Sequence, residues 1–218
     1  MKNPILRAAC RAAFVVLLSC FAAPVPAEEL AARPEPWRVI DVVGPVEVRH
    51  GDQDWQPLAE GALVVPASQI RTGRAAMVVL ARGQDQVQLM SRSSLELPPA
   101  QADGELTRLI QWFGRAFFDV DPRPSPHFEV ETPYLTAIVK GTSFVVEVSK
   151  QGASVAVDAG VVAVAAPGGT AFPVRAGQTA TAYAGLSGLD LSDDSIAVPR
   201  SEQDWPEPDF NPVDGTIQ

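Results

Sequence analysis

The fold class of this chain is clearest in residues 128–164, FEVETPYLTAIVKGTSFVVEVSKQGASVAVDAGVVAV. This stretch contains three runs rich in Val, Ile, Thr and Phe, at residues 128–130, 143–148 and 154–164. Apolar residues recur there at alternate positions, a period of two that places side chains on one face of a β-strand. We therefore expect one buried face formed by Phe144, Val146, Val148, Val155, Val157, Val162 and Val164.

Similar runs occupy most of the chain from Trp37 to Tyr183 and are separated by Gly, Pro and Asp. Strand signals at intervals of about 8 to 12 residues are typical of an all-β sandwich, barrel or solenoid. No repeat of fixed length is visible, so the sequence does not indicate a regular β-helix. We predict an all-β domain of many short strands.

Motifs in the same stretch resemble the core of FecR-type domains. They comprise the family-like residues Thr132, Pro133, Val139, Gly141, Thr142 and Phe144, followed by Gly160 and Gly177 within G-x-V-x-V and A-G-Q elements. Upstream, Leu58, Gly61 and the string Ile70-Arg71-Thr72-Gly73 are similar to the segment that opens the family pattern. The resemblance covers roughly residues 39–184 and implies a sandwich-like or solenoid-like FecR domain.

The resemblance also implies a function. In the named family members this domain lies outside the inner membrane, receives a signal from an outer-membrane transporter and relays it to a cytoplasmic anti-sigma segment. This sequence shows neither the N-terminal regulatory region nor an internal membrane helix. What the resemblance carries over is the β module, expected to act as a binding or signalling unit without cofactors.

Residues 1–27 have the features of an export signal: three basic residues, an apolar core over residues 12–23, and the cleavage pattern Val25-Pro26-Ala27. About 12 apolar residues are too few to span a bilayer, which needs about 20. A rival interpretation is a lipobox ending at Cys20, whose acylation would tether the protein to a membrane. We favour cleavage before Glu28 and a periplasmic location, with the membrane a partner only if Cys20 is lipidated.

The predicted organisation is a signal peptide at 1–27, a mobile lead at 28–36, the β domain at 37–184 and a disordered acidic, proline-rich tail at 185–218. The formal net charge is −9, and no acidic residue precedes Glu28. An acidic body repels phosphate backbones, so nucleic acid is not an expected partner. Both cysteines, Cys10 and Cys20, fall within the signal. The mature chain would therefore have no thiol chemistry.

Residues 105–120 allow two interpretations. Leu106, Leu109, Ile110, Phe113 and Phe117 fit the spacing of an amphipathic helix. Gly114 interrupts that helix, and Trp112 and Phe118 fall off its apolar face. The FecR resemblance places a strand, a glycine and a second strand here, and we favour strands.

Candidates for catalysis or metal binding are few. The two histidines, His50 and His127, lie in predicted turns, and Ser143 lies in a strand without a G-x-S-x-G elbow. Two histidines without cysteine make a poor zinc site. Glu129 and Glu131 share one strand face, which is more typical of a solvated sheet surface than of a glycosidase pair. We predict no catalytic, cofactor or metal residues.

Two further features invite a structural or a functional interpretation. Trp37, Trp55 and Trp112 could form a stacking platform for sugar or peptide, although tryptophans in β domains are more often core residues. Gly141-Thr142 is best explained by a crowded backbone position followed by a hydroxyl that satisfies a local amide.

Two functions remain open from the sequence. The first is an exported, non-catalytic binding or signalling module whose partner is an envelope protein or a cell-wall component. The second is an envelope carbohydrate-binding protein or hydrolase, which requires an aromatic platform or convergent carboxylates.

Overall fold

The computed structural model describes residues 35–99 and 106–193, and every regular element in these residues is a β-strand. The all-β prediction is confirmed. The predicted signal at 1–27, Cys20 and most of the predicted tail lie outside the described residues. Across 35–99 and 106–193 there is no helix that could cross a membrane.

The strands form two layers, which we call sheet A and sheet B. Sheet A is antiparallel throughout. Its order from edge to edge is β4 (Leu63–Val64), β1 (Trp37–Val43), β6 (Met77–Arg82), β7 (Asp85–Leu89), β9 (Thr107–Asp119), β12 (Ser143–Ser149), β13 (Gly152–Ala159), β16 (Thr179–Tyr183) and β17 (Asp190–Ser192).

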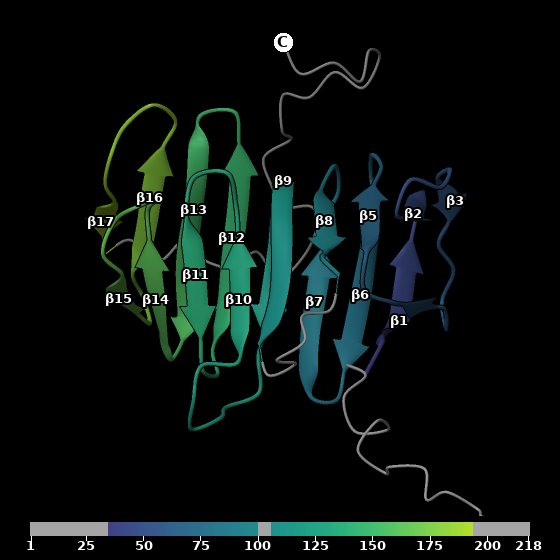
Figure 1. Cartoon of the computed structure of the whole chain (residues 1–218), viewed down its shortest axis with the longest axis horizontal. Helices are drawn as coiled ribbons and strands as arrows, with labels where there is room; N and C mark the ends of the chain where they lie inside the picture. The colour runs from purple at the N-terminus through teal and green to yellow at the C-terminus, as the bar shows by residue number, and fades with distance from the viewer. Residues whose placement is uncertain (1–34, 100–105, 194–218) are drawn as a thin grey trace, which may run out of the picture. The chain divides into compact units, whose positions relative to one another are not determined.

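Sheet B contains one parallel pair, β9 with β10, among antiparallel neighbours. Its order is β3 (Gln56–Pro57), β2 (Val46–His50), β5 (Ser68–Thr72), β8 (Ser94–Leu97), β9, β10 (Phe128–Glu131), β11 (Thr136–Val139), β14 (Val161–Ala165) and β15 (Phe172–Arg175). The long strand β9 belongs to both sheets. It lies at the centre of Figure 1, between the lower-numbered and the higher-numbered strands.

After β9 the chain alternates between the layers two strands at a time. The pairs β10–β11 and β14–β15 lie in sheet B, whereas β12–β13 and β16–β17 lie in sheet A. The single run expected at 154–164 is therefore two strands in different sheets, β13 and β14, separated at Gly160. Alternation of side chains along the sequence could not reveal this change of sheet, because both strands keep a period of two.

The core lies between the two inner faces. All seven residues predicted for the buried face are 2% exposed or less, so that prediction is confirmed. Aromatic rings connect the layers: Phe118 of β9 stacks on Phe144 at 5.0 Å between centroids and meets Phe128 of β10 edge-on at 6.1 Å. Trp37 of β1 contacts the same Phe128 ring. Burying each such ring stabilises the fold by about 1.5–3 kcal/mol.

Strand β9 crosses from sheet B to sheet A at Gly114. Residues before Gly114 pair with β8 and β10, and those after it pair with β7 and β12. Gly114 has φ +84°, and a Cβ there would lie 2.6 Å from the Arg92 carbonyl oxygen. Only glycine fits such a bend. The strand interpretation of residues 105–120 is confirmed over Thr107–Asp119, and the helical spacing was misleading.

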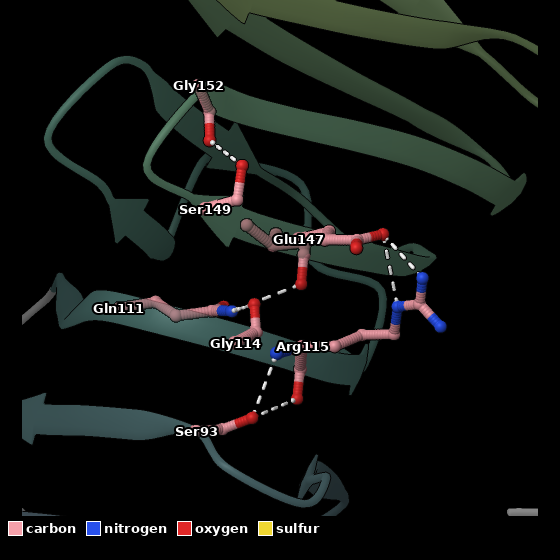
Figure 2. Close-up of polar contacts among 8 residues, drawn as sticks. Ser93, Gln111, Gly114, Arg115, Glu147, Ser149 and Gly152 are labelled. Atoms are coloured by element: carbon pink, nitrogen blue, oxygen red, sulfur yellow. Dashed lines mark hydrogen bonds and ion pairs between the residues drawn. The ribbon is translucent and has the colours of Figure 1, made fainter. Parts of the chain in front are cut away.

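Polar side chains fix this crossing (Figure 2). The buried Gln111 side chain donates from Nε2 to the carbonyl oxygens of Gly114, at 2.8 Å, and Val146, at 3.1 Å. The Ser93 hydroxyl oxygen accepts a hydrogen bond of 2.9 Å from the Arg115 amide. Arg115 also pairs with Glu147, directly opposite on β12, at 2.5 Å. These contacts connect β9 to β12 and to the residue before β8, whereas Gln111 Oε1 is buried without a hydrogen-bond partner among the described residues.

Strand β17 lies in the first part of the segment 185–218, for which we expected a tail. It pairs with β16 through Thr179–Ser192 and Thr181–Asp190. Leu189, immediately before it, is partly buried against the core. An available edge of sheet A therefore orders an acidic segment whose composition alone indicated disorder.

Candidate functional site

The outer surface of sheet B carries a cluster of polar and aromatic side chains over β2, β5, β8 and β9. Alternation directs Ile70, Leu95 and Leu109 into the core, and directs their neighbours on the same strands outward. We call this surface the polar-aromatic face, and it comprises Glu47, Arg49, Trp55, Gln69, Arg71, Glu96 and Trp112.

Four of these side chains form a hydrogen-bonded row across the strands. Arg49, Gln69 and Glu96 lie directly opposite one another on β2, β5 and β8. Arg49 donates to Gln69 Oε1 at 2.6 and 2.8 Å, and Gln69 Nε2 donates to Glu96 Oε2 at 2.8 Å. The indole Nε1 of Trp112 donates to the same Glu96 oxygen at 2.8 Å. The row fixes the Trp112 indole and leaves that residue 49% exposed.

Trp55 contacts two guanidinium groups of the same face. The Cζ atoms of Arg49 and Arg71 lie 4.8 and 4.2 Å from its ring centroid. Such cation–π contacts stabilise exposed sites by about 0.5–1 kcal/mol each. Arg71 also pairs with Glu47 on β2 at 2.7 Å. Both arginines therefore hold the Trp55 ring while they are bonded to neighbouring polar side chains.

The next strand in sheet B carries an acidic pair. Arg108 Nε of β9 lies 2.9 Å from Glu129 Oε1 and 3.1 Å from Glu131 Oε1 of β10. Partial burial raises the pKa of Glu131 above its ordinary value, a hydrogen bond to Glu129 raises it further, and Arg108 opposes the shift. The prediction that both glutamates face water needs correction, because Glu129 is buried beside Arg108. Their arrangement is an ion-paired sheet surface.

A second polar cluster lies at the start of β7, around the buried carboxylate of Asp85. Its Oδ1 accepts a 3.0 Å hydrogen bond from the Asp121 amide, and its Oδ2 lies 3.7 Å from Arg82 and 3.9 Å from Arg123. Burial lowers the pKa of Arg82, and the charge of Asp85 opposes that shift. This cluster attaches residues 121–123 of the proline-rich loop to β7.

The two histidines occupy different environments. His127 is buried, and its Nε2 lies 4.0 Å from Asp85 Oδ1. His50 ends β2, and its Nδ1 lies 3.4 Å from the Ser68 hydroxyl. Ser143, which the sequence analysis considered as a nucleophile and rejected, donates to Asp119 Oδ1 at 2.7 Å. The structure thus places His127 near one carboxylate and Ser143 with a different one.

The FecR-like motif residues build turns and core. Thr132 Oγ1 accepts from the amides of Tyr134 and Leu135, which closes the β10–β11 turn around Pro133. Val139 and Phe144 are fully buried, and Gly160 and Gly177 lie in the turns after β13 and β15. These positions therefore shape the fold and do not lie on the polar-aromatic face.

Of the two expectations for Gly141-Thr142, the structure confirms the one for Gly141 and contradicts the one for Thr142. A Cβ at Gly141 would lie 2.2 Å from Pro122 Cα, so the backbone position is crowded as predicted. The Thr142 hydroxyl is buried without a hydrogen-bond partner among the described residues, so the expectation that it satisfies an amide is wrong. The Thr142 carbonyl oxygen accepts from the Val120 amide instead. Its Cγ2 methyl group lies beside Gly160.

A model of the FecR protein family matches residues 68–163, from the start of β5 into β14. Residues 68–163 are a FecR domain. The match includes Gln69, Arg71, Glu96 and Trp112, so most of the polar-aromatic face belongs to the matched part of the FecR domain. No curated protein matches the chain.

Two crystal structures of a candidate anti-sigma factor from Parabacteroides distasonis resemble this chain in fold. Their TM-scores are 0.51 and 0.52, each at 18% sequence identity. Each match covers 58% of this chain and 60% of the other chain, so the present chain spans about three fifths of that protein's length. At this identity the likeness shows the fold alone.

Sequence reasoning missed the polar-aromatic face as a unit. The alternating pattern did indicate that Gln69, Arg71 and Glu96 point away from the core. It could not indicate that β2, β5, β8 and β9 are neighbours, because strand order is a tertiary property. Of the three tryptophans considered as a platform, Trp37 is in the core, and only Trp55 and Trp112 lie on this face.

Proposed function

We propose that this protein is an exported, non-catalytic FecR-domain module that binds a component of the cell envelope through its polar-aromatic face. The observation that carries the proposal is the exposed Trp112 indole, fixed in orientation by Glu96 inside the region that matches the FecR family. Exposed tryptophan and arginine side chains are the residue types that dominate binding energies at surfaces. Fixing them in advance lowers the entropy lost on binding.

Export to the periplasm is the second part of the proposal. It is supported by the basic and apolar pattern of residues 1–27 and by the cleavage pattern before Glu28. Cell fractionation should recover the protein with periplasmic markers. Intact-mass analysis should give a chain that begins at Glu28. A heavier, acylated chain that begins at Cys20 would instead show that the protein is a membrane-anchored lipoprotein.

A binding assay with isolated envelopes tests the proposal. The purified mature chain is mixed with washed envelope fragments and sedimented, and the bound fraction is measured for wild type, Trp112→Ala and Tyr183→Ala. Tyr183 is a matched control because it is 46% exposed on β16 of the other sheet. We expect Trp112→Ala to lose most of the binding and Tyr183→Ala to keep it. Equal binding by both variants would overturn the assignment of this face.

A separate experiment tests the proposal that the protein is not a catalyst. The wild-type protein is incubated with envelope glycan and peptidoglycan substrates, and released products are measured beside Glu129→Gln and Glu131→Gln. We expect no product from any of the three proteins. Turnover by the wild type that either substitution abolishes would show a hydrolase and overturn the binding-module proposal.

A further inference from the structure

We infer that the ligand of the polar-aromatic face is an uncharged glycan chain that lies across the strands of sheet B. The inference rests on the proposed function and specifies which envelope component is bound. It follows from three properties of the face: the group that Trp112 presents, the row of hydrogen-bonding side chains beside it, and the balance of charge.

Trp112 presents an aromatic surface. Its indole N–H already donates to Glu96 Oε2, so a ligand meets the ring and not a free donor. Trp112 is 49% exposed, the same fraction as Phe172 on β15, and no other Trp, Tyr or Phe of residues 35–99 and 106–193 is more exposed. A pyranose ring has one face of C–H groups, and stacking this face on an indole removes apolar surface from water while the hydroxyls stay outside the contact.

The row beside Trp112 supplies hydrogen-bonding groups in a plane. Arg49, Gln69 and Glu96 lie on adjacent strands, about 4.8 Å apart, and present guanidinium, amide and carboxylate groups in turn. Both hydrogen bonds that Glu96 accepts within the described residues end on Oε2, so its Oε1 can accept from a ligand hydroxyl. Sugar hydroxyls both donate and accept hydrogen bonds, so they are suited to a row in which hydrogen-bond donors and acceptors alternate.

The charges of the face cancel. Arg49 and Arg71 balance Glu47 and Glu96, and Arg71 is ion-paired with Glu47. A face that is locally neutral, on a chain of formal net charge −9, gives no attraction for a polyanion and matches an uncharged ligand. The polar-aromatic face contains four charged residues. Its composition therefore differs from that of protein–protein interfaces, whose buried cores are depleted in charge and rich in apolar groups.

The spacing of the two tryptophans favours a chain over a single sugar. The Trp55 ring contacts side chains of β2 and β5, and Trp112 lies on β9 beyond β8. Two to three inter-strand steps separate the aromatic groups, roughly 10–14 Å. A ligand that contacts both must extend over several sugar rings.

The test uses the mature chain and defined probes. Binding to chitin and cellulose, two insoluble uncharged glycans, is measured by sedimentation, and binding to chitotetraose is measured by calorimetry. The variants are Trp112→Ala, Glu96→Gln and the control Tyr183→Ala, each checked for wild-type thermal unfolding. We expect wild type and Tyr183→Ala to bind at least one probe, Trp112→Ala to bind at least tenfold more weakly, and Glu96→Gln to be intermediate.

Two results would overturn the inference. Absence of binding to every glycan, while Trp112→Ala still loses binding to envelope fragments, would mean that the face binds a protein. The proposed function would then stand without a glycan ligand. Glycan binding that Trp112→Ala leaves unchanged would place the glycan elsewhere on the molecule. Protease treatment of the envelope fragments separates the two ligand classes, because a glycan ligand survives it.

Discussion

Trp112 Nε1 and Gln69 Nε2 converge on one oxygen, Oε2 of Glu96, each at 2.8 Å. Three neighbouring strands, β5, β8 and β9, are thereby joined on the outside of sheet B by a single carboxylate. The same carboxylate holds the most exposed indole of the described residues, so the stability of this face and the orientation of Trp112 depend on one side chain.

Replacing that carboxylate should loosen the face without unfolding the domain. Glu96→Ala removes the acceptor of two hydrogen bonds, and we expect the free energy of unfolding to fall by about 1–2 kcal/mol. Acrylamide quenching of tryptophan fluorescence should also increase as the Trp112 indole is released. Equilibrium urea unfolding and quenching measure the two effects. Glu96→Gln is the matched control, because its amide oxygen still accepts, and an equal loss in both variants would contradict the role given to Glu96.

Asp85 should contribute strongly to stability because its buried carboxylate neutralises a partly buried cation. In Asp85→Ala the Arg82 guanidinium stays partly buried without that carboxylate, and we expect a loss of about 3–5 kcal/mol. The loop at 121–126 should also become more sensitive to proteases, since the Asp121 amide loses its acceptor. Thermal unfolding and limited proteolysis check both. Asp119→Ala, at an exposed carboxylate, should cost less than about 1 kcal/mol, and similar losses at the two sites would refute the prediction.

Gly141 should tolerate no larger residue. In Gly141→Val a Cβ would lie 2.2 Å from Pro122 Cα, and the strand β12 or the loop before it must shift. We expect destabilisation of more than about 3 kcal/mol and a markedly lower melting temperature. Gly168→Val serves as control because Gly168 has φ +71° but open space around its Cβ position, so it carries backbone strain alone. Wild-type-like unfolding of Gly141→Val would disprove the crowding argument.

Glu131 should give stability a specific pH dependence. Its pKa is raised in the folded protein, chiefly by burial, so the folded state binds its proton more tightly than the unfolded state does. The resulting stabilisation is present at acidic pH and is lost as pH rises through the folded pKa. Relative to wild type, Glu131→Gln should therefore gain stability between pH 4 and pH 7, as measured by thermal unfolding. The exposed Glu60 provides a control in Glu60→Gln, and a constant difference across this range would count against the prediction.

Much of the fold could be predicted because alternation is a local property. The inward positions of Phe144, Val146 and Val155 follow from a period of two along one strand, and the structure buries all three. The apolar spacing at 105–120 also fits a helix, but Gly114 allows a strand to bend between layers at that point. The family resemblance was confirmed over residues 68–163. The candidate site was less predictable, because Glu96 and Trp112 are paired by strand order and by a bulge in β9.

Local sequence patterns were enough to predict that this chain forms strands, which strand faces turn inward, and that its central region carries the FecR pattern. Those properties depend on residues a few positions apart. Strand pairing and packing were needed to show that β13 and β14 enter different sheets, that β9 belongs to both, and that Asp85 lies near His127. The same holds for the row from Arg49 to Trp112, whose members are up to 63 residues apart in sequence. Contacts between distant residues depend on how hairpins stack, and a period of two is compatible with many ways of stacking them.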